Sequence, residues 1–312
     1  MPSRSELVIG TLCTVTLYNR GNPRVYKEIF GRLKAIDNKM SLYIEGSEIN
    51  DINKAAGIRP VMVSPDVFEV IETALLFAAL SDGAFDPTIG PLVKLWDIGG
   101  ENQRVPSQEE IDEVLPLVNW RDVELNRNNS TVFLRNPGMI LDLGAIAKGY
   151  AADEAAVIIR NERIPMAIID LGGNILLVGA RGTGTLWRIG IQDPLDDRGA
   201  YTGIVQTQEK SIVTSGVYER FFIDNNIIYH HLFSPVNGYP VRNNLMSTTI
   251  ITDRSINADA LSTAVFVMGY ERGRALVESL EDVACIFVFN DHTIRVVGDV
   301  DFILYSRNYR IE

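Results

Sequence analysis

At residues 141–150 the chain reads Leu-Asp-Leu-Gly-Ala-Ile-Ala-Lys-Gly-Tyr. The apolar run from Ile140 to Leu143 predicts a short strand, the glycine after it permits a turn, and Ala145 to Arg163 predicts a helix. Amides at the start of a helix attract anionic oxygen, and Lys148 is placed to reach a phosphate. Asp142 could bind a polar edge of a ligand. A plain strand-to-helix connection with a surface lysine fits equally well, because this is not the GxxxxGK[ST] phosphate loop.

The chain before this stretch is predicted to be mainly helical. Alternating β-branched residues predict a strand near the start, and apolar residues spaced three and four apart predict helices that end at Gly or Pro signals. The predicted elements are a strand at Leu7–Tyr18, helices at Pro23–Met40, from Ser47 to a stop at Gly57, at Ser64–Ala79 and at Pro106–Leu115, and strands around Val123 and Val132.

The chain after this stretch is predicted to be rich in strands. Ala167 to Thr252 reads as strands and turns, helices are predicted at Asn257–Met268 and Glu271–Leu280, and two or three strands finish the chain. Because helices and strands do not alternate regularly, this order favours an α+β fold. No repeat or linker interrupts the pattern, so we expect residues 1–312 to form a single compact unit with two lobes.

The charge of the chain excludes one class of partner. Lysine and arginine number 29 against 40 aspartate and glutamate residues, which gives a formal net charge of −11. Such a surface repels polyanions, and no Lys/Arg-rich run offsets it, so nucleic-acid binding is not expected. An anionic ligand would need a metal ion, a helix N-terminus or a single lysine to hold it.

Membrane and redox signals are weak. No apolar stretch reaches the roughly 18 residues that a membrane-spanning helix needs. Met1 to Glu6 lacks the charged and apolar regions of a signal peptide, which predicts a cytoplasmic chain or one whose leader has been removed. Cys13 and Cys285 lie in apolar strand-like runs and are expected to be buried free thiols.

Asp259 and Thr263 are four residues apart in a predicted helix. Their oxygens therefore project from one face, and a carboxylate with a hydroxyl suits Mg²⁺ when phosphate and main-chain oxygens complete the octahedron. In the structural alternative, Asp259 stabilises the start of its own helix and Thr263 bonds to the preceding turn. On spacing alone the structural interpretation is favoured.

Two of the three histidines stand together in Tyr229-His-His-Leu-Phe-Ser-Pro-Val-Asn-Gly-Tyr-Pro. Histidine can take a proton from a nucleophile near neutral pH. In an alternating strand His230 and His231 would point to opposite faces, so at most one of them lines a site. A structural histidine beside a turn fits equally well.

Two further features could line a ligand. In Gly83-Ala-Phe-Asp-Pro-Thr-Ile-Gly-Pro-Leu, glycine and proline fix the backbone, as a loop against a flat ligand requires, although simple loop formation is the alternative. Tyr43, after Met40-Ser-Leu, could stack on an aromatic ring, but the sequence alone favours a place in the core.

In this order and combination, the motifs resemble the ApbE family, the FAD:protein FMN transferases. The resemblance runs from Gly10-Thr11 to about Gly269, and the stretch at 141–150 is its most specific marker. The other markers are Met40-Ser-Leu-Tyr with Ser47-Glu-Ile, Gly83-Ala-Phe-Asp-Pro-Thr-Ile-Gly-Pro-Leu, Thr214-Ser-Gly, Tyr229-His-His, and Asp259 with Thr263.

The resemblance implies a site by position. Family members bind magnesium through the main-chain carbonyl that matches Ala145 and the side chains that match Asp259 and Thr263, so Asp259 is expected to be catalytic. His231 matches the histidine proposed as a catalytic base, and Tyr43 matches a residue against the adenine-containing half of FAD. The positions expected to contact FAD are Leu12, Tyr43, Ala84, Phe85, Asp86, Asp142, Lys148 and Leu232.

The resemblance also implies an activity. The enzyme is expected to use Mg²⁺ to cleave FAD, to attach the FMN phosphate to a Thr or Ser hydroxyl of an acceptor flavoprotein subunit of a membrane redox complex, and to release AMP. Some family members use water instead, so an FAD pyrophosphatase is the alternative, and a non-catalytic FAD-binding protein is another. The aromatic Tyr43 resembles the transferases.

Two departures and the location complete the comparison with the family. Ser234 stands where the family often has Asp before Pro, and Val217 where it often has an acidic residue after Thr-Ser-Gly. An auxiliary acid near the phosphates is then absent or supplied elsewhere, which bears on rate and acceptor preference. The resemblance favours the periplasm, with an inner-membrane anchor behind a lipoprotein leader; a cytoplasmic location is the alternative.

Overall fold

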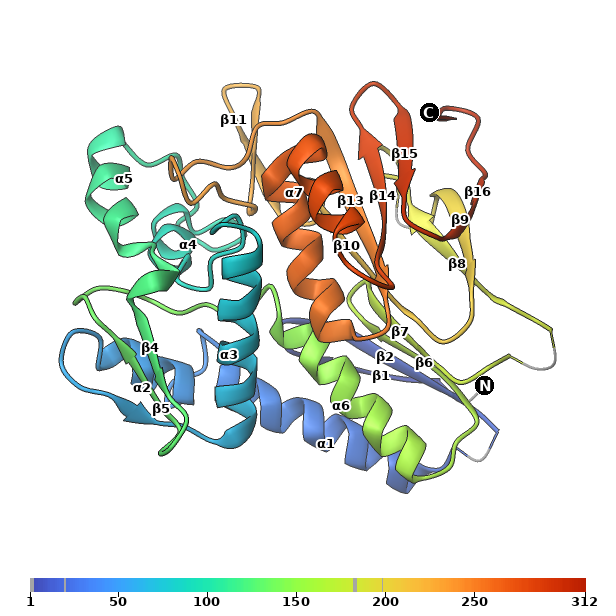
Figure 1. Ribbon diagram of the computed structural model, residues 1–312, viewed down its shortest axis with the longest axis horizontal. Coiled ribbons are helices and arrows are strands. Elements are labelled where there is room, and N and C mark those ends of the chain that lie inside the picture. The colour runs from blue at the N-terminus through green and yellow to red at the C-terminus, as the bar shows by residue number, and fades with distance from the viewer. Residues whose placement is uncertain (1–2, 20, 182–183, 198) are drawn as a thin grey trace. The chain divides into compact units, whose positions relative to one another are not determined.

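The computed structural model (Figure 1) describes residues 3–19, 21–181, 184–197 and 199–312. Among the helices in these ranges, none combines the length and the hydropathy that crossing a bilayer requires. Both cysteines are buried free thiols, as predicted.

The chain divides into two compact units. Both units combine helices with β-sheets, which confirms the α+β class. Each unit is assembled from segments that are far apart in the sequence, and the single domain over residues 1–312 stays a prediction. The first unit comprises residues 1–37, 146–216 and 244–312, and the second comprises 38–145 and 217–243.

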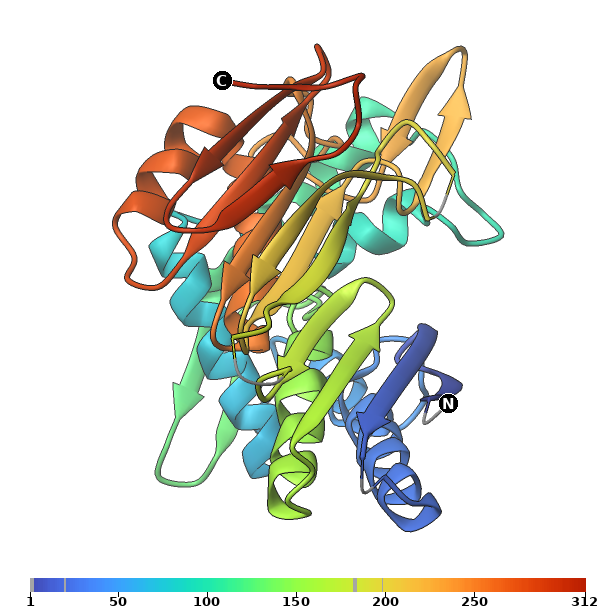
Figure 2. The ribbon, with the colours of Figure 1, turned by 90° about the vertical axis from the view of Figure 1, so that its right-hand side faces the viewer.

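A nine-stranded sheet is the main layer of the first unit (Figure 2). In spatial order its strands are β1 (Ser3–Val8), β2 (Thr11–Tyr18), β6 (Met166–Leu171), β7 (Asn174–Val178), β10 (Ser211–Gly216), β13 (Leu245–Thr252), β14 (Ala284–Phe289), β15 (Thr293–Val297) and β17 (Arg310–Ile311). Neighbouring strands are antiparallel, except that β15 and β17 are parallel.

Three helices and a smaller sheet complete the first unit. Helix α7 packs on β10 and β13, and α6 packs on α7 and β7 (Figure 1). The helices are α1 (Pro23–Met40, its last three residues in the second unit), α6 (Ala147–Asn161) and α7 (Ser255–Glu278), and the smaller sheet has the order β16 (Asp301–Leu304), β9 (Tyr201–Thr207), β8 (Trp187–Gln192). Apolar side chains of β8 and β9 share a buried cluster with those of β10, β13 and β14, so the two sheets enclose one core.

The second unit consists of short elements around an aromatic cluster. Trp96 lies at the centre of this cluster, with Tyr229, Phe233 and Tyr239 within 5.9 Å between ring centroids. The elements are α2 (Glu48–Lys54), α3 (Pro65–Leu80), α4 (Gly90–Trp96), α5 (Gln108–Val114), the 3₁₀ turns Leu115–Leu117 and Trp120–Asp122, the sheet β3 (Val61–Met62), β5 (Thr131–Leu134), β4 (Val123–Asn126), and the hairpin β11 (Phe221–Asp224), β12 (Ile227–His230).

Three predictions of elements were wrong. Four strands, β14 to β17, follow α7, where two or three were predicted. The strand predicted at Leu7–Tyr18 is two strands, because Ile9 and Gly10 both take positive φ and turn the chain back on itself. The apolar run Ile140–Leu143 is not a strand: only Ile140 forms a bridge, to Ile89. Its burial comes from packing in the second unit and not from a sheet, and periodicity cannot separate these two causes.

Candidate active site

Asp259 joins helix α7 to the start of helix α6. Its side chain is almost completely buried. Oδ2 accepts a hydrogen bond from the amide of Gly149 at 2.9 Å, and Oδ1 lies 3.8 Å from Nζ of Lys148. Two candidates that are 111 residues apart in the sequence, Lys148 and Asp259, therefore meet in one place. The helix-start amide expected to attract a ligand anion already binds a carboxylate of the protein.

The structural alternative for Asp259 was wrong in its detail. The start of α7 is stabilised by Asp153, whose two carboxylate oxygens accept hydrogen bonds from the amides of Ser255 at 2.9 Å and Ile256 at 3.1 Å. Asp259 therefore does not cap its own helix. Burial raises the pKa of Asp153 against the effect of these two amides.

Gly149 makes the contact between the two helices possible. A Cβ at this position would lie 2.3 Å from the main-chain oxygen of Ser255. Only glycine lets the backbone of α6 approach α7 this closely. The amide of Gly149 then comes within hydrogen-bonding distance of Asp259. Close packing of the two helices therefore explains why a glycine follows Lys148 in the 141–150 stretch.

Thr263 lies one turn beyond Asp259 and faces strand β10. Its hydroxyl is 3.3 Å from Oγ of Ser215, which is also 2.9 Å from Oγ of Ser262. Ser215 belongs to the Thr214-Ser-Gly marker, but its side chain was not predicted to lie in the site. A strand-to-helix contact of this kind leaves no local signal in the sequence.

The donor atoms gathered around Asp259 suit a hard cation. The carboxylate of Asp259 and the hydroxyl of Thr263 one turn further supply oxygen, the element that Mg²⁺ prefers as a ligand, and Ser215 and Ser262 lie beside Thr263. Within the described ranges, no group of three His, Cys, Asp or Glu side chains is arranged to hold a metal ion. A cation at this place would therefore need hydroxyl and main-chain oxygens beside Asp259, which is the set that the resemblance implies. Zinc-type chemistry does not fit these donors.

In the second unit, the segment before α6 lies against the predicted FAD loop. The amide of Asp142 donates to the carbonyl of Pro87 at 2.8 Å, and its Oδ1 accepts the amide of Gly144, also at 2.8 Å. Asp142 thereby holds the turn that contains Ala145. The structure thus brings Asp142 and the loop that follows Gly83 together, as two neighbouring positions for one ligand would require.

Asp86 anchors that loop from within. The carboxylate accepts hydrogen bonds from the amide and hydroxyl of Thr88, at 2.8 and 2.6 Å, and from the amide of Trp120 at 3.1 Å. Burial raises its pKa despite these three donors. Phe85 is also buried, whereas Ala84 is half-buried. Asp86 and Phe85 therefore shape the loop.

Tyr43 is exposed, so the preference for a core position was wrong. Its side chain is 75% accessible. It lines a hollow of about 460 Å³ whose other residues are Val93, Lys94, Leu95, Asp97, Asn102 and Arg104. An exposed aromatic ring can stack on a base. Arg104 is paired with Glu110 at 2.6 and 2.8 Å and Asp97 also lines the hollow, so among the lining residues Lys94 is the cation that could attract phosphate. Neither Lys94 nor Arg104 was predicted.

The two histidines take different roles. His230 ends strand β12 and is buried; its Nε2 donates to the carbonyl of Val241 at 2.9 Å and its Nδ1 accepts the amide of Leu232 at 3.3 Å. Burial lowers the pKa of this ring. Both nitrogens are used within the fold, so His230 is structural. Leu232, expected to contact FAD, is itself buried.

His231 follows the strand and is held by Arg220. The carbonyl of Arg220 accepts the amide of His231 at 3.1 Å and lies 3.2 Å from its Nδ1. A carbonyl can only accept, so Nδ1 carries the proton, and the lone pair of the neutral ring is on Nε2. A neutral ring in this tautomer could accept a proton at Nε2, and the contact with Arg220 was not predicted.

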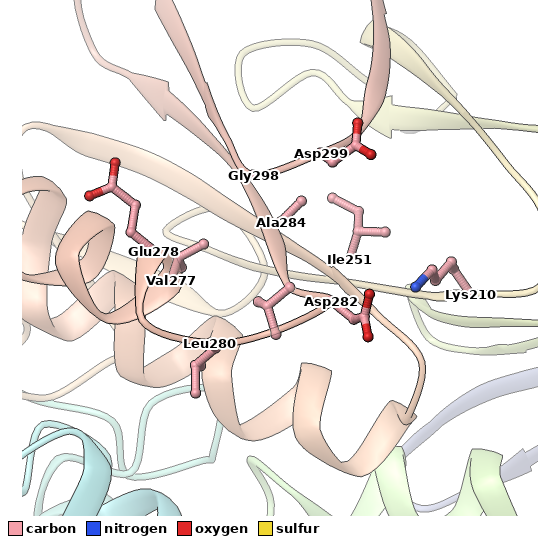
Figure 3. Close-up of a pocket in the computed structure, with 10 residues that line it drawn as sticks. Lys210, Ile251, Val277, Glu278, Leu280, Asp282, Ala284, Gly298 and Asp299 are labelled. Atoms are coloured by element: carbon pink, nitrogen blue, oxygen red, sulfur yellow. The ribbon is translucent and has the colours of Figure 1, made fainter.

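Leu12 and a second hollow lie outside the contacts described so far. Leu12, in β2 of the first unit, is exposed. A separate hollow in the same unit is lined by Lys210, Glu278, Asp282, Asp299 and apolar residues that include Ile251 and Val277 (Figure 3). None of the predicted site residues lines it, so it carries no part of the predicted chemistry.

Comparison with known proteins agrees with the motifs. The ApbE family model matches residues 9–287. A FAD:protein FMN transferase of Treponema pallidum is 39% identical over 96% of this chain and 88% of its own, and one of Klebsiella pneumoniae is 37% identical over 94% and 90%. A crystal structure of the ApbE protein of Thermotoga maritima superimposes with a TM-score of 0.86 at 33% identity, covering 96% of both chains. The expectation of an enzyme is thereby confirmed, and the chain belongs to the ApbE family.

Proposed function

We propose that this enzyme uses Mg²⁺ to cleave FAD, attaches the FMN phosphate to a Thr or Ser hydroxyl of an acceptor flavoprotein, and releases AMP. The names of the relatives support FMN transfer from FAD to protein. The observation that carries the cation-dependent step is the contact set of Asp259, which meets Lys148 and the amide of Gly149 and lies one turn from Thr263.

The electrostatic part of the reaction is assigned to Asp259, Thr263 and Lys148 and to the main-chain oxygen of Ala145. The bound Mg²⁺, with Asp259, Thr263 and the carbonyl of Ala145 as the ligands implied by resemblance, would offset the negative charge of the pyrophosphate. Lys148 adds a positive charge next to Asp259 in a protein whose formal net charge is −11. Asp259 therefore has two tasks: it orders the start of α6 and it supplies a hard ligand.

His231 is proposed to move the proton. Its Nε2 takes the proton of the acceptor hydroxyl while the hydroxyl oxygen bonds to the phosphorus on the FMN side. The bond from that phosphorus to the bridging oxygen breaks, and AMP leaves with that oxygen. Arg220, by accepting the Nδ1–H, leaves the lone pair on Nε2 for this proton.

The proposal is tested by incubating the enzyme with FAD and Mg²⁺, with and without an acceptor flavoprotein. Covalent FMN on the acceptor, seen by mass spectrometry together with one AMP for each FMN, supports it. Rapid AMP release without an acceptor would instead identify an FAD pyrophosphatase. Retention of FAD without AMP release would identify a binding protein.

We also propose a location and a partner. The resemblance favours the periplasmic side of a bacterial inner membrane, where the acceptor would be a flavoprotein subunit of a membrane redox complex. Fractionation of cells that express the gene with its native upstream sequence tests this. Recovery of the protein from the cytoplasm alone contradicts it.

A further inference from the structure

The hairpin β11–β12 is rooted at the proposed base. Arg220 precedes the hairpin and His231 follows it, and the two are joined through the amide and ring contacts of His231 described above. Asn225 and Asn226, both with positive φ, form its tight turn. Figures 1 and 2 show the hairpin as a narrow two-stranded ribbon. Within the described residues, β11 and β12 pair only with each other.

The two faces of this hairpin differ. Residues opposite each other in an antiparallel pair lie on the same face. Phe222 and Tyr229 are opposite each other, and their rings stack at 5.3 Å in the aromatic cluster around Trp96. The next pair, Ile223 and Ile228, therefore points the other way, into solvent. The face of Phe222 and Tyr229 therefore packs against the aromatic cluster, whereas the other face is held only at its base, where His230 lies opposite Phe221 and is buried.

The exposed face is apolar. We call it the outer hairpin face and define it as Phe221, Ile223 and Ile228, which are 44%, 61% and 53% accessible. Isoleucines at more than half exposure on a narrow two-stranded ribbon gain nothing for the fold in water. Adjacent exposed apolar side chains can take part in contact with another molecule. Strand rise places Ile228 roughly 10 Å along the chain from His231.

In the proposed function, transfer of FMN requires the acceptor protein to reach His231. A threonine hydroxyl is attached to Cβ, so the acceptor main chain must pass close to the imidazole that deprotonates it. An extended acceptor segment at His231 reaches the outer hairpin face within about three residues on one side. The residues two and four positions from the acceptor Thr then point toward that face, because side chains alternate along an extended chain.

Resting on the proposed function, we propose that the outer hairpin face is the docking surface for the acceptor protein, which binds as an extended segment with apolar residues at alternate positions beside its Thr or Ser. The hairpin links acceptor binding to proton transfer, because the strand that carries Ile228 ends at the pair His230 and His231. A polar segment would leave the isoleucines in water and bind less tightly.

The test compares two variants and two peptides. Ile223→Thr/Ile228→Thr keeps β-branched residues and removes the apolar face. Ile303→Thr/Ile311→Thr is the matched control, since both isoleucines are exposed strand residues of the first unit. The probes are fluorescein-labelled peptides with one central Thr, carrying either Val or Ser at the alternate positions. Binding is measured by fluorescence anisotropy without FAD, and FMN transfer by mass spectrometry.

We expect the Val peptide to bind the wild type, and its Kd to rise about tenfold or more in the hairpin variant and to stay unchanged in the control. Equal binding to both variants, equal binding of the two peptides, or no binding to the wild type would overturn the docking proposal. Binding without FMN transfer by the wild type would contradict the proposed function and leave the docking surface standing. Equal thermal unfolding of the variants shows that the hairpin has not misfolded.

Discussion

In the proposed function, the carboxylate of Asp259 serves both folding and chemistry. One oxygen orders the start of α6, and the other faces Lys148 and is available to a cation. Substitutions that separate these two tasks are therefore informative. Asparagine keeps an oxygen that can accept the Gly149 amide but lacks the negative charge, whereas alanine loses both.

For Asp259→Asn we expect a folded protein that has lost cation-dependent turnover. Because a bound cation supplies several kcal/mol of charge stabilisation, AMP formation from FAD should fall about 100-fold or more. Initial rates across a Mg²⁺ titration measure this. Asp259→Ala should lose the same activity and in addition about 1 kcal/mol of stability with the α6 contact. A Mg²⁺-dependent rate near that of the wild type in either variant would refute the metal assignment.

For His231→Ala we expect FMN transfer to fall by about two to four orders of magnitude, with FAD binding unchanged, because only the proton acceptor is removed. His292→Ala is the control, since no part of the site involves that residue. The rate of acceptor flavinylation under single-turnover conditions measures the effect. A rate close to that of the wild type removes His231 from the mechanism.

His230 should make stability depend on pH. Burial lowers the pKa of its ring below the ordinary value of 6.5. Below that value the unfolded chain binds a proton that the folded chain resists, so the free energy of unfolding falls as the pH drops. Glutamine does not titrate, so His230→Gln should lose less stability than the wild type between about pH 7.5 and pH 5.

The comparison with His230→Gln isolates the histidine. Burial raises the pKa values of Asp86 and Asp153, so their contribution has the opposite sign: their folded carboxyls hold protons more strongly, and stability falls as the pH rises past their ordinary pKa. The wild type and His230→Gln both contain these carboxyls, so their effect cancels when the two proteins are compared. Denaturant unfolding at several pH values measures how the free energy of unfolding of each protein changes with pH. The same pH dependence in both proteins would contradict this role of His230.

At this scale the sequence could predict residue types but not their partners. The spacing of Asp259 and Thr263 placed two oxygens on one helix face, and the structure keeps them there. The contacts to Gly149 and Ser215 come from other elements, so no local pattern contains them. Tyr43 was misplaced for a similar reason, because the burial of an aromatic residue depends on what packs over it.

Among the elements, helices α6 and α7 determine the geometry of the site. Their closest approach is at Gly149, where a Cβ would meet the main chain of Ser255. The position of Asp259 relative to Lys148 depends on this approach. A change in helix separation should therefore alter cation binding without changing any ligand.

For Gly149→Ala we expect a loss of about 1–3 kcal/mol in the free energy of unfolding, because the added methyl group overpacks a backbone contact. Mg²⁺ affinity should fall with it. Gly31→Ala in α1 is the matched control: no atom lies within 4 Å of the added Cβ, so better helix propensity should stabilise the protein slightly. Chemical denaturation of both variants measures the difference. Equal stability of Gly149→Ala and wild type would show that the helices are not in close contact.

Element ends were predictable where a local signal marks them. Ser47 accepts the amide of Asn50 as the N-cap of α2, and α1 begins at Pro23 as expected. The turn at Ile9-Gly10 was missed because a non-glycine residue at positive φ leaves no strong signal. Ile140–Leu143 was wrongly predicted to be a strand, because packing against distant parts of the chain, and not a sheet, buries it.

For the whole molecule, the sequence could give the class and the family, but not how segments assemble into units. Residues 146–216 join the first unit while 217–243 return to the second, and no composition change marks these points. The net charge of −11 matters for the whole molecule, because an anionic dinucleotide needs local positive charge to bind to an acidic protein. In the proposed function, Lys148 and a cation at Asp259 would supply that positive charge.

The most direct test of the proposed activity is a crystal structure of this protein grown with FAD and Mn²⁺ in place of Mg²⁺. The account predicts an anomalous peak on the oxygens of Asp259 and Thr263, with the pyrophosphate against it. Bound FAD with no metal on those two oxygens, and with its pyrophosphate elsewhere, would contradict the account.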